Sequence, residues 1–183
     1  MNQENMKEKT LITPASGQSS GLSLKVCGMQ QPGNMIQVAE LEPDYMGFIF
    51  YDKSPRYFNE ELPEIPAEIK KTGVFVNAGI EEILQKVSKY HLNAVQLHGD
   101  ETAGFCKDLK IELQKPGNTP ELIKVFSVGE NFDFQELKAF EGIVDYFLFD
   151  TKTELRGGSG KDFDWQILKE YPSNTPFFLS GGI

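Results

Sequence analysis

The chain has 183 residues and a net charge of −9, and its length suits one domain with a single hydrophobic core. The negative charge repels nucleic acid and anionic membranes at long range, so we expect neither as a partner. No apolar run approaches the roughly 18 residues that a membrane span requires. The two cysteines, Cys27 and Cys106, lack the spacing of a zinc site or a disulfide framework, which favours a cytoplasmic protein without a bound metal.

Residues 1–21 are polar and lack both the basic opening and the apolar segment of a signal peptide, so we predict a flexible N-terminal extension. Residues 22–183 are predicted to form one domain, in which short apolar runs alternate with amphipathic segments. The apolar runs read as buried strands that begin at residues 24, 45, 72, 94, 122, 143 and 176. Helices are predicted over 32–41, 80–90, 101–113 with Asp100 as its cap, from 133 onward, and over 165–171.

Strands that alternate with helices form right-handed βα units and a parallel sheet. No GxGxxG dinucleotide motif follows the first strand, so the pattern favours an α/β fold of the (β/α)₈ TIM-barrel type over a doubly wound sheet. Only about seven βα units are present. The sequence ends at Ile183, which we interpret as either a truncated product or an open seven-strand variant with exposed strand edges.

The carboxyl ends of barrel strands meet at one mouth, where parallel α/β proteins carry out their chemistry. The pattern places there a thiol, a guanidinium, an acid, amides and glycine-rich turns, namely Cys27, Arg56, Asn77, Gln96, His98, Asp150, 157–161, Gly181 and Gly182. Glycine-rich turns let backbone N–H groups approach a phosphate, although such a turn is equally typical of a flexible loop. Taken alone, Cys27 is more typical of a buried core thiol than of a reactive one.

Seven motifs follow one another along the chain: KVCG at 25–28, GFIF with SPRY at 47–57, GVFVN at 73–77, QLHGDE at 96–101, Asp150, GGSGKDFDW at 157–165 and LSGG at 179–182. In this order they resemble the phosphoribosylanthranilate isomerase family of tryptophan biosynthesis. The resemblance departs from the family in one respect, because the eighth strand, whose following turn completes the phosphate site, has no counterpart here. We therefore expect the 183 residues to bind phosphate weakly and to turn over slowly or not at all.

The resemblance implies an isomerase that needs no cofactor and rearranges N-(5-phosphoribosyl)anthranilate to the 1-deoxyribulose 5-phosphate derivative. Such an Amadori rearrangement needs an acid that protonates the furanose ring oxygen and a base that removes the C2 proton of the resulting Schiff base. By the family's pattern, Asp150 is the acid, Cys27 is the base and Arg56 binds the anthranilate carboxylate. The phosphate of this small-molecule substrate would contact Gly158, Gly160, Gly181 and Gly182.

Other interpretations stay open at this point. His98 is more typical of a packed or hydrogen-bonded residue at a strand end than of a catalyst, and Asn77 and Gln96 are interpreted as amides lining the mouth. A second phosphosugar isomerase of the histidine pathway performs the same rearrangement, but that family usually carries an aspartate at the position of Cys27. The chain could also be a fragment that binds without catalysis. We expect a monomer or a homodimer.

Overall fold

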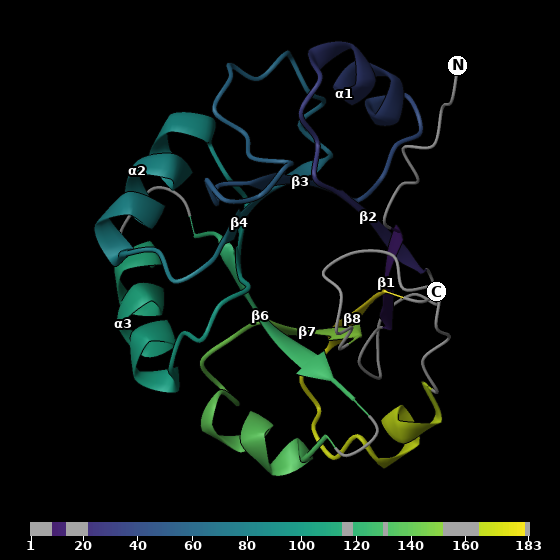
Figure 1. Cartoon of the computed structure of the whole chain (residues 1–183), viewed down its shortest axis with the longest axis vertical. Coiled ribbons are helices and arrows are strands. Elements are labelled where there is room, and N and C mark those ends of the chain that lie inside the picture. Colours follow the sequence, from purple (N-terminus) through teal and green to yellow (C-terminus); the bar gives the residue numbers. More distant parts are fainter. Residues whose placement is uncertain (1–8, 14–21, 115–118, 130–131, 152–164, 182–183) are drawn as a thin grey trace.

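The computed structural model describes residues 9–13, 22–114, 119–129, 132–151 and 165–181. Its strands form a closed barrel in the order of the sequence, and its helices lie outside the ring (Figure 1). The elements are β1 (Lys9–Thr13), β2 (Ser23–Cys27), α1 (Pro32–Ala39), β3 (Tyr45–Ile49), β4 (Lys70–Phe75), α2 (Ile80–Tyr90), β5 (Ala94–Leu97), α3 (Ala103–Leu113), β6 (Glu121–Val128), η1 (Phe134–Ala139), β7 (Tyr146–Thr151), η2 (Trp165–Glu170) and β8 (Phe177–Ser180).

Seven consecutive strands, β2 to β8, run parallel to one another, which confirms the predicted α/β barrel architecture with seven parallel strands. Their common direction gathers every strand's carboxyl end at one mouth of the ring. Within the described ranges, no helix is both long and apolar enough to cross a bilayer.

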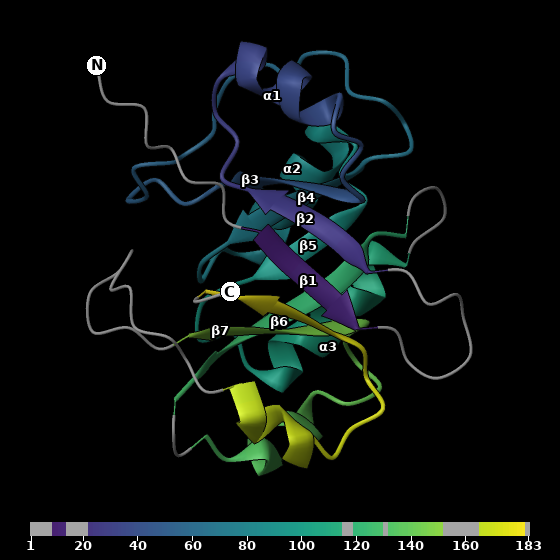
Figure 2. The same ribbon diagram turned by 90° about the vertical axis from the view of Figure 1, so that its right-hand side faces the viewer.

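The barrel is closed by a strand that the sequence pattern does not predict. Strand β1 comes from the stretch expected to be a flexible extension, and it pairs antiparallel with β2 on one side and with β8 on the other (Figure 2). The expectation of an open barrel with exposed edges is therefore wrong. Unpaired N–H and C=O groups at two facing edges favour a strand that satisfies both. Lys9–Thr13 is a short run inside a polar stretch, too short for a periodic signal.

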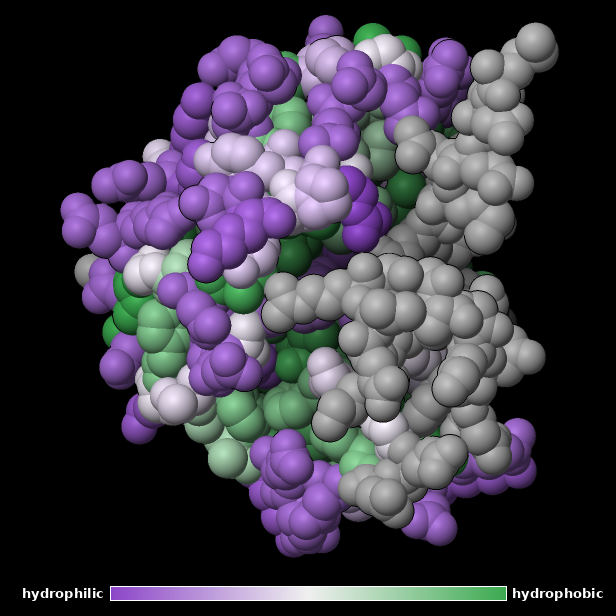
Figure 3. All heavy atoms as spheres, viewed as in Figure 1, coloured by the Kyte–Doolittle hydropathy of each residue, from purple (hydrophilic) through white to green (hydrophobic). Residues whose placement is uncertain are grey.

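The ring separates two apolar clusters because strand side chains alternate between its faces. One small cluster fills the barrel interior and consists of Tyr45, Ala94, Ile123, Val125, Leu148 and Phe178. A larger cluster lies between the strands and the helices. In β6, for example, Ile123 and Val125 belong to the interior cluster, whereas the adjacent Leu122 and Phe126 belong to the outer one. Seen down the barrel, hydrophilic residues dominate the periphery and hydrophobic residues show toward the centre (Figure 3).

The amino-terminal end of the barrel is filled by a polar group on three strands. Glu121 accepts hydrogen bonds from the Tyr45 hydroxyl at 2.9 Å and from Lys70 Nζ at 2.6 Å. Burial, with the Glu121 carboxylate adding to it, raises the pKa of Tyr45 above its ordinary value. These side chains form a polar network at the amino-terminal end of the barrel. The candidate active site is expected at the opposite end, where the carboxyl ends of the strands meet.

Several predicted helices differ in detail from the observed ones. The helices expected after residue 133 and over 165–171 are the 3-10 segments η1 and η2, although Asp133 caps the first as predicted by accepting from the Gln135 N–H at 2.9 Å. Helix α3 is capped by Thr102, whose Oγ1 accepts from the Phe105 N–H, and the prediction of Asp100 is wrong. The neighbouring Glu101 accepts hydrogen bonds from backbone N–H groups of the preceding loops, so the helix begins at Ala103 instead of residue 101.

Candidate active site

Cys27 is the last residue of β2 and lies at the carboxyl end of the barrel, as predicted. In register it faces Gly47 of β3, and a Cβ atom built on that glycine would lie 2.6 Å from Cys27 Sγ. Such an approach is shorter than any van der Waals contact, so only glycine leaves room for the thiol here. The thiol is partly exposed, whereas Cys106 is buried in α3, where burial raises its pKa to about 11. Cys106 is the core residue that the sequence predicts.

Arg56 lies on the loop that follows β3, beside the residue that comes after Cys27. Its backbone N–H donates to Ser54 Oγ at 3.1 Å, which orders the turn. Its side chain packs over Gly28, the residue after Cys27, where an added Cβ would lie 2.9 Å from Arg56 Cδ. Gly28 also has φ +80, a left-handed backbone conformation that favours glycine. The predicted guanidinium is thus placed next to the predicted base.

Asp150 lies in β7, where its register partners are Ser127 of β6 and Ser180 of β8. His98, just after β5, places Nε2 3.5 Å from Asp150 Oδ2, with both side chains partly exposed. The interpretation of His98 as a packed or hydrogen-bonded residue allows such a polar contact, but it does not name the predicted acid as the neighbour. The sequence places both residues at strand ends and so indicates that they lie at the same mouth. It does not indicate that they contact each other, because β6 lies between their strands in the barrel.

The loops after β4 and β5 are held by a buried ion pair that the sequence does not reveal. Glu101 accepts from the backbone N–H groups of Asn77 at 2.8 Å and Gly99 at 3.0 Å. Its other partner is Lys124 Nζ at 3.3 Å, and both side chains are almost completely buried. Because this pair ties together the segments on either side of His98, it fixes the position of the His98–Asp150 contact.

The two amides predicted to line the mouth have different environments. Asn77 Oδ1 accepts from the Asp100 N–H at 2.7 Å, so this side chain ties two loops together. Gln96 is buried in β5, and within the described part of the chain its Oε1 atom has no hydrogen-bond partner.

Of the four glycines predicted to contact phosphate, Gly158, Gly160 and Gly182 lie outside the described residues. Gly181 follows β8 and has φ +76. A Cβ on Gly181 would lie 2.2 Å from Thr151 Oγ1 and 3.0 Å from Asp150 Oδ1. The described phosphate candidate therefore adjoins the predicted acid, where only glycine fits.

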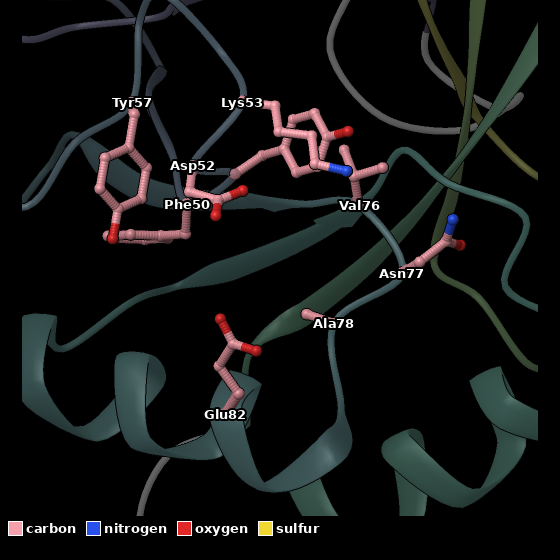
Figure 4. A pocket seen from close by; sticks show the side chains of 9 residues that line it. Phe50, Asp52, Lys53, Tyr57, Val76, Asn77, Ala78 and Glu82 are labelled. Atoms are coloured by element: carbon pink, nitrogen blue, oxygen red, sulfur yellow. The ribbon is translucent and has the colours of Figure 1, made fainter.

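A pocket of about 480 Å³ lies to one side of these residues, between the loop after β3 and the start of α2. Figure 4 shows Glu82 of α2 pointing toward the loop that carries Asp52 and Lys53. Neither Cys27, Arg56 nor Asp150 lines it. Among the described side chains, no group of three or more His, Cys, Asp or Glu residues is arranged to hold a metal ion.

Comparisons with known proteins agree with this arrangement. Residues 24–183 match the family model of N-(5'phosphoribosyl)anthranilate (PRA) isomerase. A protein named N-(5'-phosphoribosyl)anthranilate isomerase from Parabacteroides distasonis is 48% identical over 166 residues, which cover 87% of this chain and 72% of that protein. The matched segment thus includes every described candidate residue.

Solved structures of the same family share the fold. Phosphoribosyl anthranilate isomerase from Thermotoga maritima superposes with a TM-score of 0.70 and 34% identity, covering 87% of this chain and 76% of that one. A second structure holds reduced 1-(o-carboxyphenylamino)-1-deoxyribulose 5-phosphate and superposes with a TM-score of 0.51 and 26% identity over 70% and 75% of the two chains. This chain belongs to the N-(5'-phosphoribosyl)anthranilate isomerase family.

Proposed function

We propose that this chain catalyses the Amadori rearrangement of N-(5-phosphoribosyl)anthranilate, with Asp150 as the general acid and Cys27 as the general base. The observation that carries the proposal is the placement of the acid, the thiol and Arg56 at one mouth of a barrel of this isomerase family. A thiol at the end of β2 also distinguishes this chain from the histidine-pathway isomerases, which usually carry an aspartate there.

The first step opens the sugar ring. Asp150 donates its proton to the furanose oxygen while the C1–O bond breaks, which leaves a Schiff base between C1 and the anthranilate nitrogen. His98 lies 3.5 Å from Asp150 and is partly exposed, so it connects the acid with solvent. A histidine exchanges protons near neutral pH, and this one is placed to return a proton to Asp150 after each turnover.

The second step moves a proton from carbon to sulfur. The Cys27 thiolate removes the C2 proton, so the C2–H bond breaks, an S–H bond forms and the electron pair neutralises the Schiff base as an enolamine, which then tautomerises to the ketone. Arg56 offers a planar fork of donors that suits the anthranilate carboxylate. Gly181, together with Gly158, Gly160 and Gly182, is proposed to contact the phosphate.

The test is turnover of N-(5-phosphoribosyl)anthranilate, followed by the loss of anthranilate fluorescence at high enzyme concentration so that slow turnover is detected. We expect turnover that is absent from a heat-denatured control. Calorimetry with the reduced product analogue measures binding in parallel. Binding without any turnover would contradict the catalytic proposal and favour a non-catalytic fragment, and absence of both would overturn the assigned ligand as well.

Replacing His98 with Asn tests its proposed link to the acid. We expect kcat to fall by about 10-fold or more with KM nearly unchanged, because a group that returns the proton to the acid acts in the catalytic cycle and not in ground-state binding. Added imidazole should restore part of the loss, since it can carry the same proton. A rate that neither falls nor responds to imidazole would show that His98 only packs.

Two further expectations stay predictions. One is a cytoplasmic location. The other is a monomeric or homodimeric state, which light scattering of the purified chain would measure.

A further inference from the structure

Lys25 is a charged residue at an unusual place, two positions before Cys27 and on the same face of β2. Its side chain is 1% exposed, which makes it one of the largest fully buried side chains in the described protein. Burying an isolated ammonium costs several kcal/mol, so buried lysines are normally paired with an opposite charge. The location of this lysine therefore calls for a counter-charge.

The geometry around Gly47 shows which group is closest. A Cβ built on Gly47 would lie 2.6 Å from Cys27 Sγ and 3.2 Å from Lys25 Nζ. Both atoms thus lie against the same backbone position of β3, and the missing side chain of Gly47 leaves them as neighbours. Lys25 is opposite Tyr45 in the register, but its Nζ atom lies near Gly47, which is opposite Cys27. Its side chain therefore extends along the strand toward Cys27 and the mouth.

Other partners for Lys25 are scarce. Within the ranges that the structure describes, no carboxylate lies within ion-pair distance of Lys25 Nζ. Thr72, the β4 residue next to Gly47 in the register, is buried, and its Oγ1 has no hydrogen-bond partner among the described residues. That hydroxyl is an acceptor for an ammonium but brings no charge.

The remaining charged groups near Cys27 belong to neighbouring elements. Arg56, on the loop after β3, packs over Gly28, and the His98–Asp150 contact belongs to the β5 and β7 side of the mouth. Among the described groups, Lys25 therefore shares the Gly47 position with the thiol, Arg56 packs over the next residue, and only Lys25 is fully buried.

We propose that Lys25 is a positioning residue that holds Cys27 as a thiolate for its role as the base. The thiol proton moves to the lysine amine, so the S–H bond breaks, an N–H bond forms and a buried ammonium–thiolate pair results. During turnover the ammonium stays protonated while the sulfur gains and loses the C2 proton. The inference rests on the proposed function only for the last of these steps, because the proposed proton transfer from thiol to amine needs no substrate.

The test measures alkylation of Cys27 by iodoacetamide as a function of pH, since only the thiolate reacts. Cys106 does not interfere, because it is fully buried and its pKa is raised to about 11. In Lys25→Met we expect the midpoint of the alkylation profile to move up by about one pH unit or more, as loss of an adjacent opposite charge predicts. The alkylation rate at pH 6.5 should fall about 10-fold or more, and kcat should fall with KM nearly unchanged.

Three further variants separate charge from packing. Lys138→Met removes an exposed lysine on η1 and should leave the profile unchanged. Lys25→Arg keeps the charge and should stay closer to the wild type than Lys25→Met. If Lys25→Met fails to fold, Lys25→Gln, which removes the charge but keeps a polar side chain, should raise the midpoint in the same way.

An unchanged profile in folded Lys25→Met or in folded Lys25→Gln would overturn the inference. A different experiment tests the proposed function: if Cys27→Ala keeps its turnover, Cys27 is not the base. A thiolate that depends on Lys25 together with unaffected Cys27→Ala turnover would leave the ion pair established and remove Cys27 as the base.

Discussion

An Asp150→Asn variant is expected to turn over N-(5-phosphoribosyl)anthranilate about 10²- to 10⁴-fold more slowly than the wild type, the usual loss when a general acid is removed. The amide keeps the shape of the side chain and its place in β7 but has no acidic proton for the ring oxygen. Affinity for an already opened, reduced product analogue should stay nearly unchanged, because the acid acts in the transition state of ring opening. Fluorescence gives the rate, and calorimetry gives the affinity.

Asp52→Asn is the matched control for this experiment. Asp52 also follows a barrel strand, but it lines the pocket beside α2, which neither Cys27 nor Asp150 lines. We expect this variant to keep its rate within about threefold of the wild type, the ordinary range of a surface substitution. Near-normal turnover of Asp150→Asn would place the acid elsewhere, and a large loss in Asp52→Asn would identify Asp52 as the better candidate.

A Lys124→Met variant is expected to lose about 3–5 kcal/mol of unfolding free energy, the usual result of removing one partner of a buried ion pair. Glu101 would stay buried among backbone N–H groups without its 3.3 Å cationic partner. Lys124 also donates to the Gly99 carbonyl at 2.8 Å, so the loop before α3 loses a second contact. Urea unfolding followed by fluorescence measures the change.

Two comparisons give this prediction its contrast. Lys89→Met breaks an ion pair with Glu61 in which the side chains are 49% and 88% exposed, so it should shift the unfolding midpoint little. The double variant Glu101→Gln with Lys124→Met removes both charges and should be more stable than Lys124→Met alone. A single variant as stable as the double one would show that the buried carboxylate costs nothing.

The parallel barrel and much of its mouth follow from local patterns in the sequence. Apolar runs such as 45–51 and 122–128 mark strands covered on both faces, and their spacing leaves room for one helix each. Because parallel strands share a direction, Cys27 and Asp150 must then lie at the same end. The common position of these two residues therefore follows from strand direction alone, without knowledge of tertiary contacts.

Three features that the sequence does not reveal depend on contacts between distant segments. Strand β1 is five residues long and is defined by the two edges it joins, not by its own composition. The Glu101–Lys124 pair and the His98–Asp150 contact join the loop after β5 to β6 and β7, so no spacing along the chain reports them. The burial of Lys25 is hidden for a different reason, since a lysine in an alternating strand is normally a solvent-facing residue.

Strand β1 has a consequence for the order in which the protein assembles. Its pairing with β2 joins residues that are close in the chain, such as Leu11 and Leu24, whereas its pairing with β8 joins Leu11 to Leu179. The entropy lost in closing a loop rises with its length, so the hairpin of β1 and β2 can form early, and the seam to β8 closes late. On the ribosome that seam must wait until Phe177–Ser180 has emerged, and until then the hairpin carries an unpaired edge that a chaperone or a second nascent chain can reach.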